Sequence, residues 1–373
     1  MICTRKISPL QDPDGAKNSP KANSAQGMRP GDMSITRSDV LCGLAASLLC
    51  LFSPAFAASE PQTGLKLIIP TAKGGINDLA GRLTAKHLGR FLPGMPALQA
   101  VNDESGGVAV ANRFATESSE TEEIAILQRG IAQLAIQGDT SAKFDPLKLN
   151  WLGSLSSFAN DAYMLIVNAR HPAKTVWDLA PPAPPALIGG DAPGSSNLTF
   201  ALIAKHALKL NIEIKDGFSG AAGMFFAMKD GDLDGQVIGL NSLMANQSDL
   251  WRNRDVRVLL QFGRSTRHPL LPEVPLASEY TRDRDALNLV KFAEAPLGMA
   301  LPFVAPASLP RQRVSELQRA FLAMTRDPGF LADAANAKLE ITPVDAAGVR
   351  RIIAAMQATP KELIARYNAI TTL

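Results

Sequence analysis

Residues 65–82 read LKLIIPTAKGGINDLAGR, and this stretch decides the fold. Residues 65–69 alternate apolar and polar side chains up to Pro70, which is the pattern of a β-strand. A glycine-rich turn follows at 71–77, and from Asp78 onward apolar residues recur at helical spacing, namely Leu79, Leu83, Leu88, Phe91 and Leu92. The segment therefore predicts a strand, a tight turn and a helix in direct succession.

The same strand and helix signals continue along the chain. Short apolar runs occur at 124–127, 163–167, 186–188, 236–240, 256–262 and 298–304. Helical patterns lie between them, including 198–210 and 311–325. This alternation predicts an α/β fold with largely parallel sheets.

Composition narrows the class of protein. The chain has 373 residues, of which 46% are hydrophobic and 20% charged, and its formal net charge is +3. This is enough apolar material for two compact domains, and it excludes disorder as the main state. The near-neutral charge argues against a nucleic-acid partner, which would select a strong basic excess. Because all three cysteines (Cys3, Cys42 and Cys50) precede residue 58, thiol chemistry and disulfides are excluded beyond it.

The first 57 residues read as an N-terminal extension and signal peptide. Residues 40–52 form an apolar run preceded by Arg37, and they are too few to span a bilayer comfortably. Ala55 and Ala57 supply the small residues expected at a cleavage site, so we predict cleavage near Ala57 and export to the periplasm. No later segment is long and apolar enough to be a transmembrane helix by this criterion, so a soluble mature protein is expected.

The turn at 71–77 is suited to binding an anion. Its residues are Thr71, Ala72, Lys73, Gly74, Gly75, Ile76 and Asn77. The first N–H groups of a helix lack internal partners and lie at the positive end of the helix dipole. The two glycines would let a ligand approach the backbone closely, and Lys73 would add a full positive charge.

A second turn of this kind lies at 189–197, which reads GGDAPGSSN. It follows the apolar run at 186–188 and precedes the helical pattern at 198–210. Its candidate ligand-binding residues are Gly194, Ser195, Ser196 and Asn197, whose side chains are typical of helix N-caps. Either turn alone could be an ordinary cap, but the pair favours a clamp for a carboxylate.

Five stretches resemble, in the same order, motifs of the substrate-binding receptors of tripartite tricarboxylate transporters, the Bug family. The matching residues are Pro70, Gly74-Gly75 and Asp78 with Ala80-Gly81-Arg82; Val101-Asn102 with Gly106-Gly107; Gly194-Ser195; Phe218-Ser219-Gly220 with Gly231-Asp232-Leu233-Asp234; and residues 267–275 with Glu279.

The resemblance implies a type II periplasmic-binding-protein fold, in which two α/β lobes enclose a ligand cleft, and no catalysis. We expect residues 64–166 and 296–373 to form lobe 1 and residues 167–295 to form lobe 2, with hinges near Asn168 and Pro296. Closure would then bring the first turn against the second and against a loop at Ser219 and Gly220. The implied partners are a small carboxylate and membrane transporter subunits, the receptor itself being a monomer, and Asp78 is expected to cap its helix.

Two alternatives to a transport receptor are a ligand-sensing module for a membrane sensor kinase and a hydrolase using Ser219. Residues 217–221 narrowly miss the nucleophile motif Gly-x-Ser-x-Gly. A hydrolase would also need a histidine base, and His87, His171, His206 and His268 are all expected on surfaces or in loops. Residues 230–241 begin like a calcium loop but lack its final glutamate, so no metal or other cofactor is expected.

Overall fold

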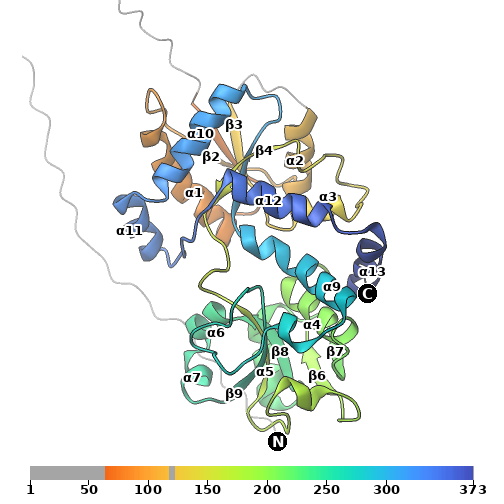
Figure 1. The fold of residues 1–373 in the computed structure, drawn as a ribbon. Helices are drawn as coiled ribbons and strands as arrows, with labels where there is room; N and C mark the ends of the chain where they lie inside the picture. The colour runs from red at the N-terminus through yellow and green to blue at the C-terminus, as the bar shows by residue number, and fades with distance from the viewer. Residues whose placement is uncertain (1–63, 117–121, 373) are drawn as a thin grey trace, which may run out of the picture. The chain divides into compact units, whose positions relative to one another are not determined.

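The structure is a computed structural model that describes residues 64–116 and 122–372. The predicted extension, signal peptide and cleavage site lie outside the described residues. The described chain has two β-sheets, each at the centre of one lobe and covered by helices (Figure 1). This architecture confirms the predicted α/β class.

The first lobe contains a six-stranded sheet. Its strands, in spatial order, are β11 (Val344–Asp345), β4 (Asn150–Ser154), β10 (Pro302–Ala305), β3 (Glu123–Ile126), β1 (Lys66–Ile69) and β2 (Gln99–Asn102). The strand predicted at 65–69 is β1, the central partner of β2 and β3. Its side chains are almost entirely buried because helices cover the sheet.

The second lobe contains a five-stranded sheet. Its order is β7 (Ile212–Lys215), β6 (Ala186–Gly189), β8 (Gly235–Gly239), β5 (Tyr163–Asn168) and β9 (Val256–Phe262). β5 pairs with β8 and β9. The chain therefore leaves the first sheet between Ser154 and Tyr163, and not near Asn168 as expected. The apolar run at 163–167 fits a buried strand in either sheet, so sequence could not assign it.

Both sheets are mixed, which corrects the expectation of largely parallel sheets. β1 runs parallel to β2 and β3, and β6 runs parallel to β7 and β8. β10 runs antiparallel to β3 and β4, and β5 runs antiparallel to both of its neighbours. Strand β5 follows the first crossing between lobes, and strand β10 follows the return. Each is thus outside the local strand–helix–strand units that produce parallel pairs.

Helices cover both sheets. Those of the first lobe are α1 (Ile76–Leu88), η1 (Gly89–Phe91), α2 (Gly107–Thr116), α3 (Ile131–Ile136), α10 (Arg311–Met324), α11 (Pro328–Asn336) and α12 (Ala346–Gln357). Those of the second are η2 (Val176–Leu179), α4 (Ser196–His206), α5 (Gly220–Asp230), α6 (Leu240–Asn246), α7 (Ser248–Arg252), α8 (Ala277–Tyr280), α9 (Arg284–Glu294) and η3 (Ala295–Met299). A hydrophobic cluster joins the lobes, since it contains both Trp151 and Phe200.

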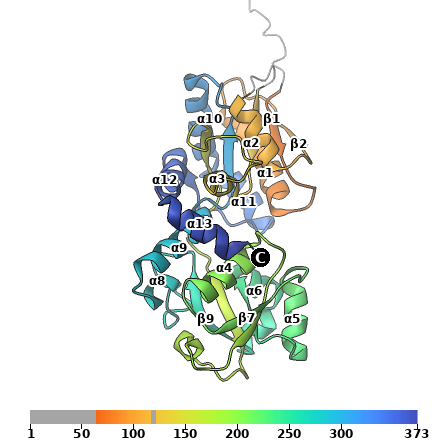
Figure 2. The ribbon, with the colours of Figure 1, turned by 90° about the vertical axis from the view of Figure 1, so that its right-hand side faces the viewer.

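The last helix, α13 (Lys361–Thr371), does not stay with the first lobe. It packs against α4 and α9 (Figure 2), and Tyr367 meets Phe292 of α9 edge-on at 4.9 Å between ring centroids. The expected assignment of 296–373 to one lobe is thus wrong for this helix. The buried residues of α13 are Leu363 and Tyr367. Two apolar positions do not indicate which lobe the helix packs against, so the sequence could not assign it.

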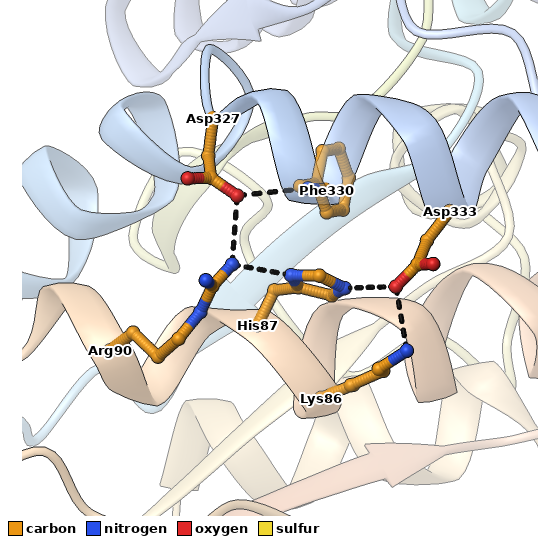
Figure 3. Close-up of polar contacts among 6 residues, drawn as sticks. All are labelled: Lys86, His87, Arg90, Asp327, Phe330 and Asp333. Carbon is orange, nitrogen blue, oxygen red and sulfur yellow. Dashed lines mark hydrogen bonds and ion pairs between the residues drawn. The ribbon is translucent and has the colours of Figure 1, made fainter.

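A polar network fixes α11 on α1 (Figure 3). His87 Nε2 lies 2.7 Å from Asp333 Oδ2, and Arg90 Nη2 lies 2.5 Å from His87 Nδ1. Because a guanidinium only donates, the geometry fits a ring whose Nδ1 accepts from Arg90 and whose Nε2 donates to Asp333. His87 is buried within α1, which corrects the expectation of a surface or loop position, whereas His268 is buried but lies in the loop between β9 and α8. Within residues 64–116 and 122–372, Ser219 is hydrogen-bonded to no histidine, so no such contact supports the hydrolase alternative.

No helix in the described ranges combines the length and hydropathy needed to cross a membrane.

Candidate functional site: a cavity between the lobes

A cavity of about 940 Å³ lies between the two lobes. Its walls come from the N-terminal turns of α1 and α4, from α3, from the segment joining α9 to β10, and from the last turn of α13. Its polar and charged lining residues are Asn77, Gln128, Arg129, Gln133, Gln137, Asp139, Ser195, Ser196, Thr199, Tyr367, Asn368, Thr371 and Thr372. Segments far apart in sequence thus meet at one concave site, as ligand sites typically require.

The first predicted turn reaches the cavity through its last two residues. Ile76 and Asn77 line it, at the first positions of α1. Thr71, Ala72, Lys73, Gly74 and Gly75 are not among the lining residues, and all but Thr71 are exposed. Lys73 is therefore not a cavity cation in this structure.

Asp78 holds the first turn in shape. Its carboxylate accepts hydrogen bonds from Gly74 N (3.0 Å), Arg82 Nε (3.0 Å) and Asn102 Nδ2 (2.8 Å). Asn102 Nδ2 also donates to Thr71 O at 2.9 Å. Burial opposes ionisation of Asp78, but the hydrogen bonds from Arg82, Gly74 and Asn102 prevail and lower its pKa to about 2. Asp78 thus supports the turn from behind, and Asn102 joins it to strand β2.

The second predicted turn also reaches the cavity. Gly194, Ser195 and Ser196 line it, at the N-terminus of α4. Asn197 does not, because its side chain points into the turn. Its Oδ1 accepts from Leu198 N at 2.6 Å and from Ser195 Oγ at 2.7 Å. Asn197 is therefore a capping residue of α4 and not a cavity residue.

Asp191 connects the second turn to the loop at Ser219 and Gly220. Its Oδ2 accepts from Asn197 Nδ2 at 2.8 Å, and its Oδ1 accepts from Gly220 N at 2.7 Å. Neither Ser219 nor Gly220 lines the cavity. In this structure the loop supports the second turn through Asp191, and its contact with a ligand after closure stays a prediction.

Arg129 is the cavity residue that sequence reasoning missed. It follows β3, and its Nη2 donates across the cleft to Ser196 Oγ (2.6 Å) and to Tyr163 OH (3.1 Å). The guanidinium carbon also lies 5.6 Å from the Phe158 ring centroid and 5.8 Å from that of Tyr163. Arg129 is the only lysine, arginine or histidine among the described lining residues. In the sequence, Arg129 is a single arginine after a short apolar run and belongs to no recognisable motif. Only the folded structure shows that it lies in the cavity.

The guanidinium retains donors for a ligand. Within the described ranges only Nη2 of Arg129 makes hydrogen bonds, which leaves the Nε and Nη1 hydrogens without partners. Aromatic rings back its position, since Tyr163 stacks on Phe158 at 5.3 Å and packs against Phe200 at the same centroid distance. The site therefore has a positive charge held in place by these contacts, with unused N–H donors that can form single charge-assisted hydrogen bonds to a carboxylate.

Comparison with known proteins shows the fold. No family model and no curated protein match the sequence. Among solved structures, a TctC solute-binding protein from Polaromonas is 18% identical, with 81% of this chain and 98% of that chain covered and a TM-score of 0.63. The periplasmic binding protein BugD is 15% identical over 82% of this chain and 97% of its own, with a TM-score of 0.52.

An R. palustris protein solved with adipate is 19% identical over 83% of this chain and 98% of its own, with a TM-score of 0.51. All three matches cover most of the described chain and nearly the whole of the other protein. The chain therefore has the two-lobed α/β fold of the periplasmic solute-binding proteins.

Proposed function

We propose that this protein is an exported solute-binding receptor of the tripartite tricarboxylate transporter type. It captures a small organic acid between its lobes in the periplasm and delivers it to membrane transporter subunits. The observation that carries this proposal is the cavity itself. The N-termini of α1 and α4 and the side chain of Arg129 all line it. The R. palustris protein solved with adipate has a similar fold.

Closure explains how the site would gain affinity. The lobes are joined by the segments between β4 and β5, between α9 and β10, and between α12 and α13, so small dihedral changes there would open and close the cavity. A carboxylate placed beside Arg129 would accept hydrogen bonds from its guanidinium and from the N–H groups in the first turns of α1 and α4. Excluding water from the closed site strengthens these hydrogen bonds. The buried Thr71 Oγ1 has no hydrogen-bond partner in the described chain and is a spare polar group in the first turn.

The test is ligand binding with a matched arginine pair. A thermal-shift panel of monocarboxylates, dicarboxylates, tricarboxylates, amino acids and neutral sugars should yield at least one acid that raises the melting temperature. Calorimetry with that acid should show that Arg129→Gln weakens binding by about 10- to 100-fold, the range for loss of a charge-assisted hydrogen bond. Arg311→Gln, at an exposed position that begins α10, should leave binding unchanged.

Two outcomes would contradict the proposal. One is a panel in which only neutral sugars stabilise the protein. The other is equal acid affinity in the Arg129→Gln and Arg311→Gln variants.

A further inference from the structure

The two ends of the cavity differ in electrostatic sign. At one end lie the N-termini of α1 and α4, helices of 13 and 11 residues, together with Arg129. Each helix N-terminus carries about half a positive charge. Because Arg129 is bonded to Ser196, the first residue of α4, these positive groups are concentrated in one place.

The other end of the cavity is formed by the last turn of α13 and by the residues after α3. Asn368, Thr371 and Thr372 line it from α13, and Gln137 and Asp139 line it from the chain beyond α3. A hydrogen bond of 3.0 Å from Asn368 Nδ2 to Gln137 O joins the two segments, and Figure 2 shows α13 next to α3. A helix C-terminus carries about half a negative charge.

Asp139 is an exposed residue of the cavity lining and adds a negative charge to this end. Its Oδ1 accepts from Ser141 N at 2.8 Å and from Ser141 Oγ at 2.5 Å, which leaves Oδ2 without a partner in the described chain. The hydrogen bonds from the Ser141 side chain and backbone lower the pKa of Asp139, so it is ionised at neutral pH. The lining residues at this end include no lysine, arginine or histidine.

Helix α3 runs along the cavity between Arg129 and Gln137. It has six residues, a length of about 9 Å, and Gln133 and Leu134 line the cavity between Arg129 and Gln137. A second carboxylate on an elongated acid would therefore lie near the C-terminus of α13 and the Asp139 carboxylate. An ammonium group there would find acceptors and an opposite charge.

We propose that the ligand is an elongated zwitterion, with its carboxylate at Arg129 and its ammonium group at the Asp139 end. This rests on the proposed function, since it assigns a chemical class to the same cavity. Asp139 then acts as the residue that discriminates an ω-amino acid from a diacid of equal length.

The experiment compares acids matched in chain length. Calorimetry would measure the whole folded chain with 4-aminobutanoate against succinate, 5-aminopentanoate against glutarate, and 6-aminohexanoate against adipate. We expect the amino acid to bind at least tenfold more tightly than the diacid in the pair that fits best. Asp139→Asn should reduce that preference to threefold or less, whereas Asp230→Asn, at an exposed position on α5, should preserve it.

The result separates this inference from the proposed function. Tighter binding of the diacid in every pair, with no response to Asp139→Asn, would overturn the zwitterion assignment and leave the receptor function standing. Absence of binding by every acid in the wider panel would overturn both. Unchanged melting temperatures of the unliganded variants would show that the Asp139→Asn effect is not a folding defect.

Discussion

The two turns that reach the cavity have the same local design but different supports. Each follows a buried strand, precedes a helix and contains a glycine at positive φ, +94° at Gly74 and +81° at Gly194. The first is braced by Asp78, whose carboxylate is bonded to the Arg82 guanidinium. The second is braced by Asp191, which accepts only from the uncharged donors of Asn197 and Gly220 and forms no ion pair in the described chain.

The difference in supports suggests different roles for the two turns: the first is held rigidly within its own lobe, and the second is coupled to the other lobe. The charged support of the first turn lies entirely within the first lobe, where Asn102 ties it to the sheet. The second turn is joined through Asp191 to the start of α5 and through Ser196 to Arg129 on the other lobe. We infer that the first turn is the fixed half of the site and that the second is the half whose position responds to closure.

The largest expected effect is on stability when Asp78 is removed. Asp78→Ala leaves Gly74 N, Arg82 and Asn102 without their shared acceptor, and should cost about 2 kcal/mol, a figure reduced because Arg82 is partly solvent-exposed. Asp191→Ala loses hydrogen bonds from uncharged donors only and should cost less, about 1 kcal/mol. Urea unfolding of both variants measures the difference. Equal losses, or a larger one for Asp191→Ala, would remove the proposed contrast.

The pH dependence of folding gives a second comparison. The pKa of Asp78 is about 2 in the folded protein, below its ordinary value of 3.8. Its ionised form therefore adds stability that is complete above pH 4 to 5 and is lost as pH falls toward 2. The free energy of unfolding of Asp78→Asn should decline less steeply across this window than that of the wild type. Identical slopes would show that the ionised carboxylate does not stabilise the turn.

Alanine substitutions at neighbouring glycines test the first turn's backbone. Gly74 has φ +94°, so Gly74→Ala should destabilise the protein by about 1 kcal/mol through strain. Gly75 has φ −83° with open space around an added Cβ, so Gly75→Ala should change stability by less than about 0.5 kcal/mol. Thermal unfolding of the pair gives the measurement. A costly Gly75→Ala would mean that the turn is more tightly enclosed than described.

The smallest effect is expected at the helix caps of the second lobe. Ser195 Oγ accepts from Leu198 N at 3.4 Å, but Asn197 Oδ1 accepts from the same N–H at 2.6 Å. Ser195→Ala should therefore cost about 0.5 kcal/mol, the low end for an N-cap residue. Ser219 occupies the N-cap position of α5 without a capping hydrogen bond, so Ser219→Ala is the matched control with no expected loss. A loss above about 1 kcal/mol at Ser195 would mean that Asn197 does not share the cap.

Sequence predicted local structure better than connectivity between the lobes. The apolar run at 256–262 is strand β9, and the pattern at 311–325 contains α10, because periodicity records which side chains are buried. The same signal cannot tell which sheet receives β5. Both turns were predicted from their glycines and caps, and each brings residues to the cavity. Arg129 and the α13 wall were missed because their roles depend only on what the fold places opposite them.

The position of the last helix has a practical consequence for handling this protein. Thr371 and Thr372 belong to the cavity wall, so a bulky label attached to either residue would lie at the edge of the cavity. Affinities measured with such a label would include interference from it. An environment-sensitive dye on an exposed residue of α13 would instead turn the same proximity into an optical sensor for ligand uptake.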